Sequence, residues 1–592
     1  MRNLKIVLFL FVLVACRNRS EGQVRNYTSL YDLSFKLNYT DSAVNIWVQS
    51  GALLLPEKRD SIYQWTYLSD PETSQNKFNT RFYQQLLIEP SEKNRKSAVS
   101  ITAAGHRIDR VTVSVIGLSH RQQPLFESVL RFKPDESLSE ETNEFILLKN
   151  TSLLRLIIDV EGKPDRKTNI SFDQIEITIG GKPLDSYPVA ALAPVKYDGK
   201  GVDLSVINNI NTIEALQNSR ILGLGESVHH NEVMQKYIYD VAFNQIEKGL
   251  CKLYIYENYL DQLLLFNRYI NNEIELDSGS LAIIKKQHLE FFERIKSYNK
   301  NKAKSERVSI YGMDFRSDTD RAIREIFNYL YLLNKEKRNI SVDKLALSLT
   351  EKGWREKSID YIRYNRDSLS AVINNEELDL LSHYLNLCGK LPQNKQKKTD
   401  MRDSLMAVTS QFLINNYLPQ SKQAIIYAHA GHITDKQSYF AFNYGSETLG
   451  FYLQSAYGKD YLKTVILAGA GSSVLFDPFG ELVVKEFAEN IEGSLEKAFA
   501  EANKGGSFYV PSDDILDRLT YIRYIGNNNI RKEFAVLNPS VQFDGMFYIP
   551  EAYTKMDIMH IKNESPLKKV NTEAQLYNQR IEELQRRVSS NE

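Results

Sequence analysis

The stretch 220–232 constrains the fold of this chain more than any other part of the sequence. Residues 221–225 form a short apolar run with two glycines, which is typical of a buried strand with closely packed neighbours. Glu226 ends this run, and His229 follows three residues later, where the apolar spacing becomes helical. At that spacing we expect both side chains on one face of the first helical turn. Because ligands bind where strands of an α/β sheet end, the stretch predicts a functional site.

Three more apolar runs in the same part of the chain end in titratable side chains. The runs, each with the side chains that end it, are 253–257 with Glu257, 308–314 with Asp314, and 424–432 with His429 and His432. The carboxyl ends of parallel strands meet at one edge of a sheet, so we expect these side chains to converge with Glu226 and His229. Two further apolar runs, 464–468 and 546–549, extend the sheet. This alternation of strands and helices predicts an α/β fold with a mostly parallel sheet.

Residues 26–182 have a different pattern, because short alternating or aromatic-rich runs follow one another without helices between them. Such a pattern is typical of an all-β sandwich of antiparallel strands. A linker rich in proline and glycine, 183–204, separates this domain from the α/β domain at 205–555. We expect the sandwich to be either a packing module or a carbohydrate contact that uses Trp47 and Trp65. The packing role is favoured, since aromatic side chains in strands usually lie in the core.

Residues 1–16 have the pattern of an export signal. Two basic residues precede an apolar run, 6–15, which is too short to span a bilayer as a permanent helix. The run ends in Leu-Val-Ala-Cys, which resembles the signal of bacterial lipoproteins, whose cysteine is lipidated. We therefore expect an exported protein that is anchored through Cys16 to the cell membrane or the outer membrane, with 17–25 as a tether. The alternative is a simple secretory signal, in which Cys16 has no role in anchoring.

Composition narrows the range of partners. Lys and Arg together number 74, and so do Asp and Glu, so no net charge favours nucleic acid. Cys251 and Cys388 are far apart in sequence, which predicts buried thiols rather than a disulfide framework or a metal knuckle.

Two helical segments flank the last strands. Residues 320–418 show amphipathic patterning and are expected to form a helical insertion that acts as a lid or wall over the strand ends. The tail, 556–592, contains one short amphipathic helix with too few heptads for a coiled coil, so we expect it to pack on the body.

The motifs at the strand ends resemble the erythromycin esterase family. The matching segments are Gly-Glu-Ser-Val-His at 225–229, the strand ending in Glu257, Tyr-Gly-Met-Asp at 311–314, Arg-Asp-Ser-Leu-Met at 402–406 and Ala-His-Ala-Gly-His at 428–432. The resemblance implies an erythromycin-esterase-like α/β domain with a helical insertion. It also implies an enzyme that hydrolyses a small-molecule ester or lactone without a serine nucleophile, a cofactor or a metal.

In that family the histidine of the Gly-Glu-x-x-His motif is the general base, and the resemblance assigns this role to His229. Its ordinary pKa of about 6.5 suits proton transfer from water near neutral pH. Glu226 and Glu257 are then expected to orient His229 or raise its basicity, while His429 and His432 bind or polarise the ester. The resemblance further implies substrate-binding roles for Asp314, Arg402 and Lys236.

Other interpretations of the same residues stay open. Glu226 or Asp314 can cap the helix that follows it. Arg402 and Asp403 can form an exposed helical pair, and the histidines can be core residues. A divalent metal is the mechanistic alternative, because three imidazoles and two or three carboxylates suit an ion such as Zn²⁺. For the whole protein, the alternatives are a non-catalytic surface lipoprotein that binds glycan or peptide, and an enzyme that modifies envelope polysaccharide.

Overall fold

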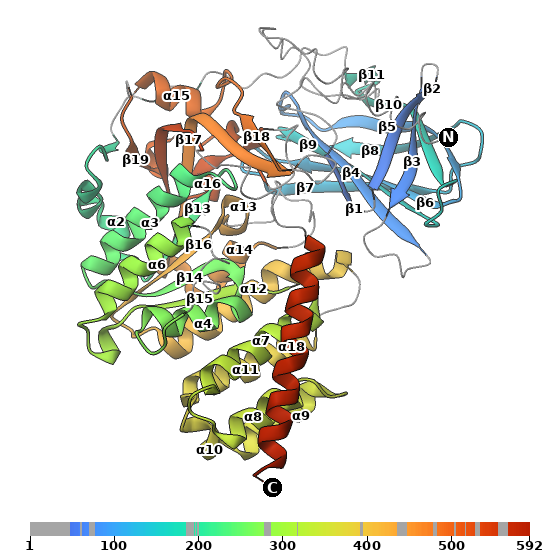
Figure 1. Cartoon of the computed structure of the whole chain (residues 1–592). Helices are drawn as coiled ribbons and strands as arrows, with labels where there is room; N and C mark the ends of the chain where they lie inside the picture. The colour runs from blue at the N-terminus through green and yellow to red at the C-terminus, as the bar shows by residue number, and fades with distance from the viewer. Residues whose placement is uncertain are drawn as a thin grey trace, which may run out of the picture.

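The computed structural model describes most of the chain from residue 48 onwards (Figure 1). The described ranges are 48–51, 53–59, 62–69, 77–184, 195, 197, 201–276, 286–316, 318–390, 395–434, 447–476, 482–502, 505–515, 517–526, 533–554 and 566–591. The export signal, Cys16, the tether and Trp47 lie outside these ranges, so their interpretation stays a prediction.

Two antiparallel sheets form the N-terminal part of the described chain (Figure 1). The first contains, in spatial order, β1 (Val48–Gly51), β4 (Phe78–Leu87), β9 (Leu153–Gly162), β6 (Ile108–Leu118) and β7 (Pro124–Phe132). The second contains β2 (Leu53–Arg59), β3 (Ile62–Ser69), β10 (Asn169–Ile179), β5 (Arg95–His106) and β8 (Ser139–Leu147), with β11 (Lys182–Pro183) paired to β10. The predicted all-β sandwich of antiparallel strands is confirmed.

Side chains on these strands alternate between the core and the outside. On β5, Val99, Ile101 and Ala103 are buried, whereas the residues between them are half-buried. Trp65 is fully buried in this core, with its ring centroid 4.8 Å from that of Phe82. Trp65 therefore packs inside the sandwich and presents no face for stacking on carbohydrate.

A second large sheet carries the predicted strand ends. Its spatial order is β12 (Val202–Asp203), β19 (Phe508–Pro511), β22 (Gly545–Ala552), β17 (Tyr461–Phe476), β13 (Ile221–Glu226), β16 (Gln423–His429), β14 (Cys251–Tyr259) and β15 (Ser309–Asp314). Neighbouring strands from β22 to β15 are parallel. Strands β12, β19 and β18 (Leu482–Glu486) pair antiparallel with their neighbours. The predicted mostly parallel sheet is confirmed, and β13, β16, β14 and β15 lie side by side.

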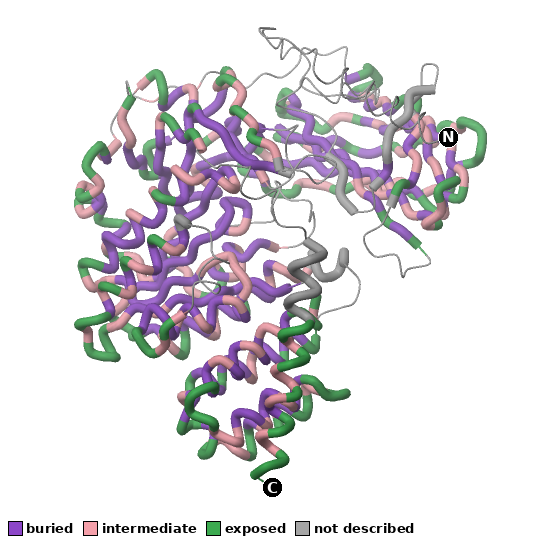
Figure 2. The backbone as a smooth tube through the Cα atoms, in the orientation of Figure 1, coloured by how far each residue is buried: buried purple, intermediate pink, exposed green. Residues whose placement is uncertain are grey.

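Helices cover both faces of this sheet, so β13 and β16 are buried along their whole length (Figure 2). Leu222 and Ile425 pack into one apolar cluster, whereas their neighbours Ile221 and Ile426 pack into another. The helices in the first cluster include α3 (Glu232–Glu247) and α6 (Lys286–Asn299), and those in the second include α12 (Lys395–Tyr417) and α14 (Leu449–Tyr457). The strand ends are thus held between two packed layers.

A series of helices separates β15 from β16. They are α7 (Thr319–Asn334), α8 (Ile340–Ser348), α9 (Trp354–Tyr364), α10 (Arg366–Ser370), α11 (Asn375–Cys388) and α12. In Figure 1, α8, α9 and α10 lie beside the C-terminal end of helix α18 (Pro566–Ser589), on the side of the molecule away from the sandwich. Leu584 of α18 is fully buried, and Arg587 pairs with Asp343 of α8 at 2.7 Å. The tail helix thus packs on the outer insertion helices, while α12 brings Arg402 to the strand ends as a wall.

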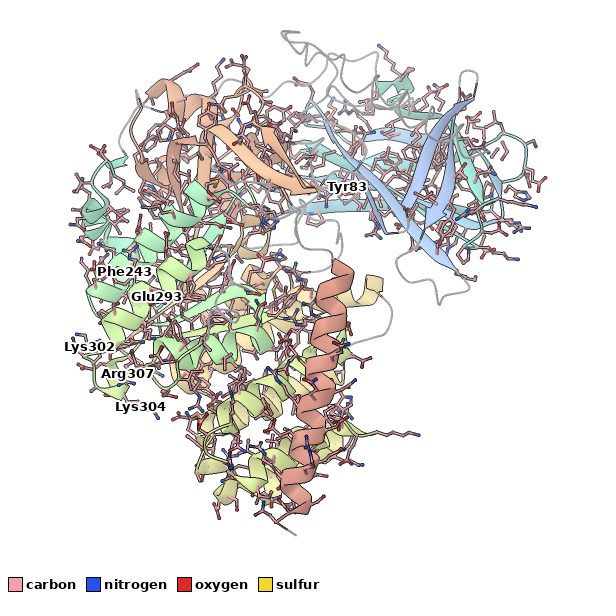
Figure 3. The ribbon with its side chains drawn as sticks, viewed as in Figure 1. Tyr83, Phe243, Glu293, Lys302, Lys304 and Arg307 are labelled. Atoms are coloured by element: carbon pink, nitrogen blue, oxygen red, sulfur yellow. The ribbon has the colours of Figure 1, made fainter. Side chains whose placement is uncertain are left out.

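A hairpin joins the sandwich to the α/β domain. It consists of β20 (Thr520–Arg523) and β21 (Phe534–Leu537), which pair antiparallel. Its apolar side chains share a cluster with the outer face of the first sandwich sheet. Figure 3 labels one member of this cluster, Tyr83 of β4, at the boundary between the two domains.

Both predicted thiols are buried in the α/β domain. Cys251 and Cys388 are unpaired and buried, as predicted, and burial raises the pKa of each thiol to about 12. Among the helices of the described ranges, none combines the length and apolar character needed to cross a membrane.

Candidate functional site

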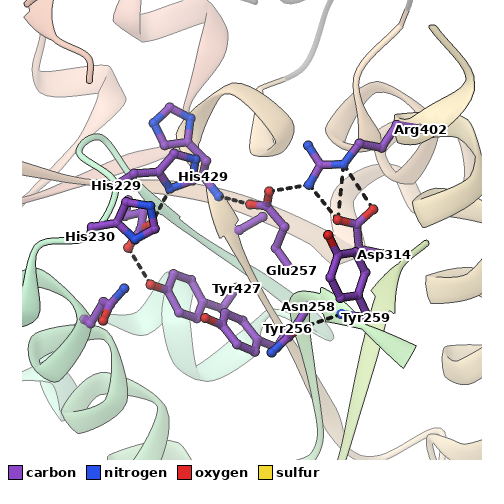
Figure 4. A pocket seen from close by; sticks show the side chains of 13 residues that line it. His229, His230, Tyr256, Glu257, Asn258, Tyr259, Asp314, Arg402, Tyr427 and His429 are labelled. Atoms are coloured by element: carbon purple, nitrogen blue, oxygen red, sulfur yellow. Dashed lines mark hydrogen bonds and ion pairs between the residues drawn. The ribbon is translucent and has the colours of Figure 1, made fainter. Parts of the chain in front are cut away.

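The carboxyl ends of four adjacent strands enclose a cavity of about 210 Å³ (Figure 4). The described residues that line it are Glu226, His229, His230, Gln235, Tyr256, Glu257, Asn258, Tyr259, Asp314, Arg402, Tyr427, Ala428 and His429. Of the side chains expected to converge, His432 is not part of this lining, but it contacts Arg402 and Glu257 from behind. The strand ends thus bring Glu226, His229, Glu257, Asp314 and His429 together at one cavity.

Glu226 and His229 form a hydrogen-bonded pair across a turn. Nδ1 of His229 lies 2.7 Å from Oε1 of Glu226. The carboxylate accepts, so Nδ1 carries the proton and Nε2 carries the lone pair. The expectation of one helical face is wrong, because residues 227–231 precede the helix and α3 begins at Glu232. The cap of α3 is Asn231, whose side chain accepts a first-turn N–H, so Glu226 is not the cap.

Burial determines the chemistry of Glu226. The side chain is almost fully buried, and this burial raises the pKa of its carboxyl to about 6. The hydroxyl of Tyr427 donates to the carboxylate and opposes that shift. At neutral pH the ionised carboxylate can therefore stabilise an imidazolium at His229, and mild acid removes this support.

His429 lies against His229 as a neutral ring. Their ring centroids are 4.1 Å apart. Burial and the neighbouring His229 lower the pKa of His429 well below its ordinary value. Nε2 lies 3.3 Å from the carbonyl oxygen of Ile525 and donates its proton there, while Nδ1 lies 3.4 Å from the backbone N–H of Gly431. Both ring nitrogens of His429 are thus engaged within the protein.

The opposite wall is a network of charges around Arg402 (Figure 4). Nη2 of Arg402 lies 2.7 Å from Oε1 of Glu257 and 2.7 Å from Oδ2 of Asp314. Burial opposes the charge on Glu257, but His432 and Arg402 outweigh it and hold the pKa of Glu257 well below its ordinary value. Arg402 is therefore not part of an exposed helical pair. Asp314 is not a helix cap either, since Asp318 caps α7.

His432 supports this network from behind. Its Nδ1 lies 2.9 Å from Oδ1 of Asp403, and its Nε2 lies 3.4 Å from Oε1 of Glu257. Burial opposes protonation, but the carboxylates of Asp403 and Glu257 outweigh it and raise the pKa of His432 to about 10. Two cations, His432 and Arg402, are thus surrounded by three carboxylates: Glu257, Asp314 and Asp403.

Lys236 lies away from the cavity. Its Nζ pairs with Oδ2 of Asp240 on the same helix at 2.8 Å, and its side chain is 73% exposed. The preceding residue, Gln235, lines the cavity instead. Successive residues of an α-helix point about 100° apart, so two neighbours rarely face the same site. This placement gives no support to substrate binding by Lys236. His230 lines the cavity as well, from a backbone with φ of 55°.

Several lining groups were missed from the sequence. Tyr256, Asn258, Tyr259 and Tyr427 each lie within two residues of a predicted strand-end side chain. Their position was therefore available, but tyrosines in strands are usually core residues. Ile525 acts through its backbone carbonyl, for which a sequence carries no signal.

Two carboxylates of the cavity, Glu257 and Asp314, already have a cationic partner in Arg402. The guanidinium of Arg402 occupies the space between Glu257 and Asp314 that a bridging metal would need. Within the described ranges, no group of three or more His, Cys, Asp or Glu side chains is arranged to hold a metal ion. In this arrangement Glu257 and Asp314 hold Arg402 between them, and a chelator experiment tests the divalent-metal alternative.

Comparison with known proteins addresses the α/β domain and the sandwich separately. A family model described as erythromycin esterase matches residues 332–552, and no curated protein matches the chain. A protein of known structure from Bacillus cereus is 15% identical, with a TM-score of 0.46, over 61% of this chain and 95% of that one. A mutant of the erythromycin esterase EreC in its open conformation is 15% identical, with a TM-score of 0.42, over 62% of this chain and 100% of that one. A carbohydrate-binding module in complex with β-1,4-galactotriose is 13% identical, with a TM-score of 0.17, over 22% of this chain and 88% of that one.

The matched range contains part of the site. Arg402, His429 and His432 lie inside it, whereas Glu226 and His229 precede it and join the site through the parallel pairing of β13 with β16. Residues 332–552 of this chain thus match the erythromycin esterase family model.

Proposed function

We propose that this protein hydrolyses a carboxylic ester or lactone with water that is activated by His229. The observation that carries the proposal is the hydrogen bond of 2.7 Å between Nδ1 of His229 and Oε1 of Glu226 at the wall of the cavity. It gives Nε2 the lone pair that a general base needs. The erythromycin esterase family match supports the same reaction class.

The proposed reaction needs no covalent intermediate. Nε2 of His229 takes a proton from water as the water oxygen bonds to the ester carbonyl carbon. The imidazolium that forms is stabilised by the carboxylate of Glu226. The tetrahedral intermediate then breaks its bond to the leaving alkoxide oxygen, and that oxygen takes the proton back from His229. The products are a carboxylic acid and an alcohol.

Arg402 is the group that we assign to the developing oxyanion. It lines the cavity, and its guanidinium retains its charge at all relevant pH values. His429 is less suited to this task, because its Nε2 proton is donated to the carbonyl of Ile525. His432 does not line the cavity and acts through Arg402 and Glu257 instead.

The size of the cavity limits the substrate. A volume of about 210 Å³ is below the roughly 300–1,000 Å³ of sites that enclose a drug-sized ligand. The cavity therefore takes the ester group and its nearest substituents, and a larger alcohol or acyl part extends beyond it. A small ester or lactone is thus a better first substrate than an intact macrolide.

The decisive experiment compares the wild type with His229→Ala on activated esters, lactones and macrolides. We expect hydrolysis of at least one activated ester by the wild type and its loss in the variant. If the two proteins are equally active, the mechanism is wrong. If neither is active on the panel, ester hydrolysis is wrong, and glycan or peptide binding becomes the function to test. Treatment with a chelator should leave the activity unchanged, and loss of activity that added Zn²⁺ restores would support the metal alternative.

We further propose that Cys16 anchors the exported protein to a membrane through a lipid. The support is the apolar run that ends in Leu-Val-Ala-Cys. Cys16→Ser should leave the protein soluble or unprocessed in cell fractionation, and unchanged partitioning into membranes contradicts the proposal.

A further inference from the structure

The hairpin β20–β21 has one side on the sandwich. The apolar cluster between them is contributed by three strands of the sandwich, β4, β6 and β9, and by the hairpin together with Leu519, which precedes it. Its buried members are Tyr83, Leu87, Ile116, Leu118, Leu153 and Ile157 from the sandwich, and Leu519, Tyr521, Phe534 and Val536 from the hairpin side. Burial of this many apolar side chains makes the contact a fixed interface rather than a loose tether.

Polar contacts fix the register of that interface. Gln122, in the loop after β6, is fully buried. Its Oε1 accepts from the backbone N–H of Asn538 and from Nε2 of Gln542, both at 3.1 Å. The side chain of Asn538 in turn donates to the carbonyl of His120 at 3.2 Å. The residues that follow β21 are thus bound to the sandwich by hydrogen bonds as well as by apolar packing.

An internal ion pair stiffens the hairpin. Arg523 and Glu533 are fully buried and pair at 2.8 Å. The guanidinium also donates to the carbonyl of Gly469 at 3.1 Å and to the side chain of Asn490 at 2.7 Å. Because a buried charge with these partners has few alternative positions, Arg523 holds the residues that follow it in place.

Those next residues contact the proposed catalytic histidines. The carbonyl of Ile525 accepts the backbone N–H of His229 at 2.9 Å and the Nε2–H of His429 at 3.3 Å. The N–H of Ile525 donates to the carbonyl of Ser227 at 2.9 Å. One peptide of the hairpin therefore fixes both the turn that carries His229 and the tautomer of His429.

Tyr524 holds the other side of His429. Its ring meets the imidazole edge to face, with centroids 4.5 Å apart and planes at 77°. Its hydroxyl lies where a Cβ on Gly431 would come within 2.3 Å, so a glycine is needed there. The hairpin side thus packs on β4, β6 and β9 of the sandwich, and the residue that follows β20 contacts His429.

We infer that the β-sandwich positions the active site, because it holds the hairpin whose residues Tyr524 and Ile525 orient His429 and His229. The outer face of β4, β9 and β6 is consequently an internal interface where the hairpin covers it, and not a free glycan-binding face. Tyr524, Ile525 and Ile157 are positioning residues, since they act through the histidines. The catalytic part of this inference rests on the proposed hydrolysis, whereas its structural part does not.

Two neighbouring isoleucines of β9 provide a matched test in the full chain. Ile157 is buried against the hairpin, whereas Ile158 is buried in the core of the sandwich. Ile157→Ala and Ile158→Ala remove the same atoms, so each is expected to lower the melting temperature. Only Ile157→Ala should shift the nitrogen-NMR signals of the His229 and His429 rings. It should also lower kcat between about 10-fold and 100-fold with little change in KM, since small misplacements of catalytic groups have effects of this size.

Equal shifts in both variants, or none in either, overturn the inference. If Ile157→Ala does not fold, the milder pair Ile157→Val and Ile158→Val replaces the two alanine variants, with the same expected difference in ring shifts. The NMR readout is independent of hydrolysis. Selective ring shifts in a protein without esterase activity therefore contradict the proposed function alone, whereas esterase activity with unselective shifts contradicts the positioning role alone.

Discussion

The two walls of the cavity place similar carboxylates in opposite chemical states. Glu226 and Glu257 both end parallel strands of one sheet, and both are largely buried. Burial raises the pKa of Glu226 to about 6, because its partners are a hydroxyl and a histidine that is neutral when it donates. Burial also disfavours the charge on Glu257, yet the cations His432 and Arg402 reverse the direction of its pKa shift. The partners of a buried carboxylate, rather than its burial, thus decide whether it titrates near neutral pH.

This difference separates two tasks. The Glu226 wall exchanges protons in the pH range where the enzyme is proposed to work. The wall around Arg402 keeps its charges and fixes positions, including the backbone of His429, whose N–H donates to Glu257 at 2.7 Å. Substitutions in the two walls should therefore differ in their dependence on pH as well as in size.

The largest expected effect is that of His229→Ala. Removal of a general base lowers the rate by about 10²–10⁴-fold, so kcat/KM on the best activated ester should fall by that amount. His230→Ala is the matched control, since His230 also lines the cavity, whereas His229 is the imidazole that is hydrogen-bonded to Oε1 of Glu226. Its loss should be at least tenfold smaller, and similar losses would mean that His229 is not the base.

Glu226→Gln should cause the next largest loss, about 10²-fold, because a neutral amide cannot stabilise the imidazolium. In the wild type, kcat/KM should fall as the pH falls through about 6, where Glu226 becomes protonated. The raised pKa of Glu226 also affects the free energy of unfolding. Its stabilising contribution is fully present below the ordinary pKa of 4.5 and is lost as the pH rises through about 6. The free energy of unfolding in urea should therefore decline less between pH 4.5 and 7 for Glu226→Gln than for the wild type. A wild-type activity profile that is flat across pH 6 contradicts this assignment.

The third effect comes from the other wall. Arg402→Lys keeps the charge but cannot bridge Glu257 and Asp314 with one planar group. We expect kcat to fall by about 10-fold. The loss of activity in acid should still occur near pH 6, because the substitution leaves Glu226 unaffected. Steady-state kinetics from pH 5 to 8 measure both. If the pH at which activity is lost in acid moved by a full pH unit, the two walls would not be independent.

These differences between the walls explain what was predictable. The strand ends and their convergence followed from apolar runs that end in titratable residues, because parallel strands bring such ends to one edge. The charge states did not follow, because they depend on contacts between residues far apart in sequence. Arg402 lies 145 residues from Glu257, and Tyr427 lies 201 residues from Glu226. The link to the sandwich did not follow either, since Ile525 contributes a backbone carbonyl that any residue possesses.

His432 makes a smaller contribution, which should be visible in stability. Its pKa in the folded protein is about 10 against an ordinary value of 6.5. The stabilisation is therefore complete below pH 6.5 and is lost as the pH rises through about 10, by at most about 1.4 kcal/mol for each pH unit. The free energy of unfolding in urea should decline over this range in the wild type and decline less in His432→Gln. Asp403→Asn should move the decline to lower pH, and identical curves for all three proteins contradict a protonated His432.

The smallest effect is expected at Lys236, and it tests where the Glu226 wall ends. Lys236 pairs with Asp240 in solvent, whereas Gln235 lines the cavity. Because surface ion pairs contribute little, Lys236→Ala should change kcat/KM by less than about twofold. It should change the free energy of unfolding by less than about 1 kcal/mol. Gln235→Ala should raise KM several-fold with a smaller change in kcat, since its side chain can contact substrate but not the reacting atoms. If Lys236→Ala instead raised KM more than Gln235→Ala, the substrate would lie along the exposed face of α3, outside the cavity. The wall formed by Glu226 and His229 would then extend to that face.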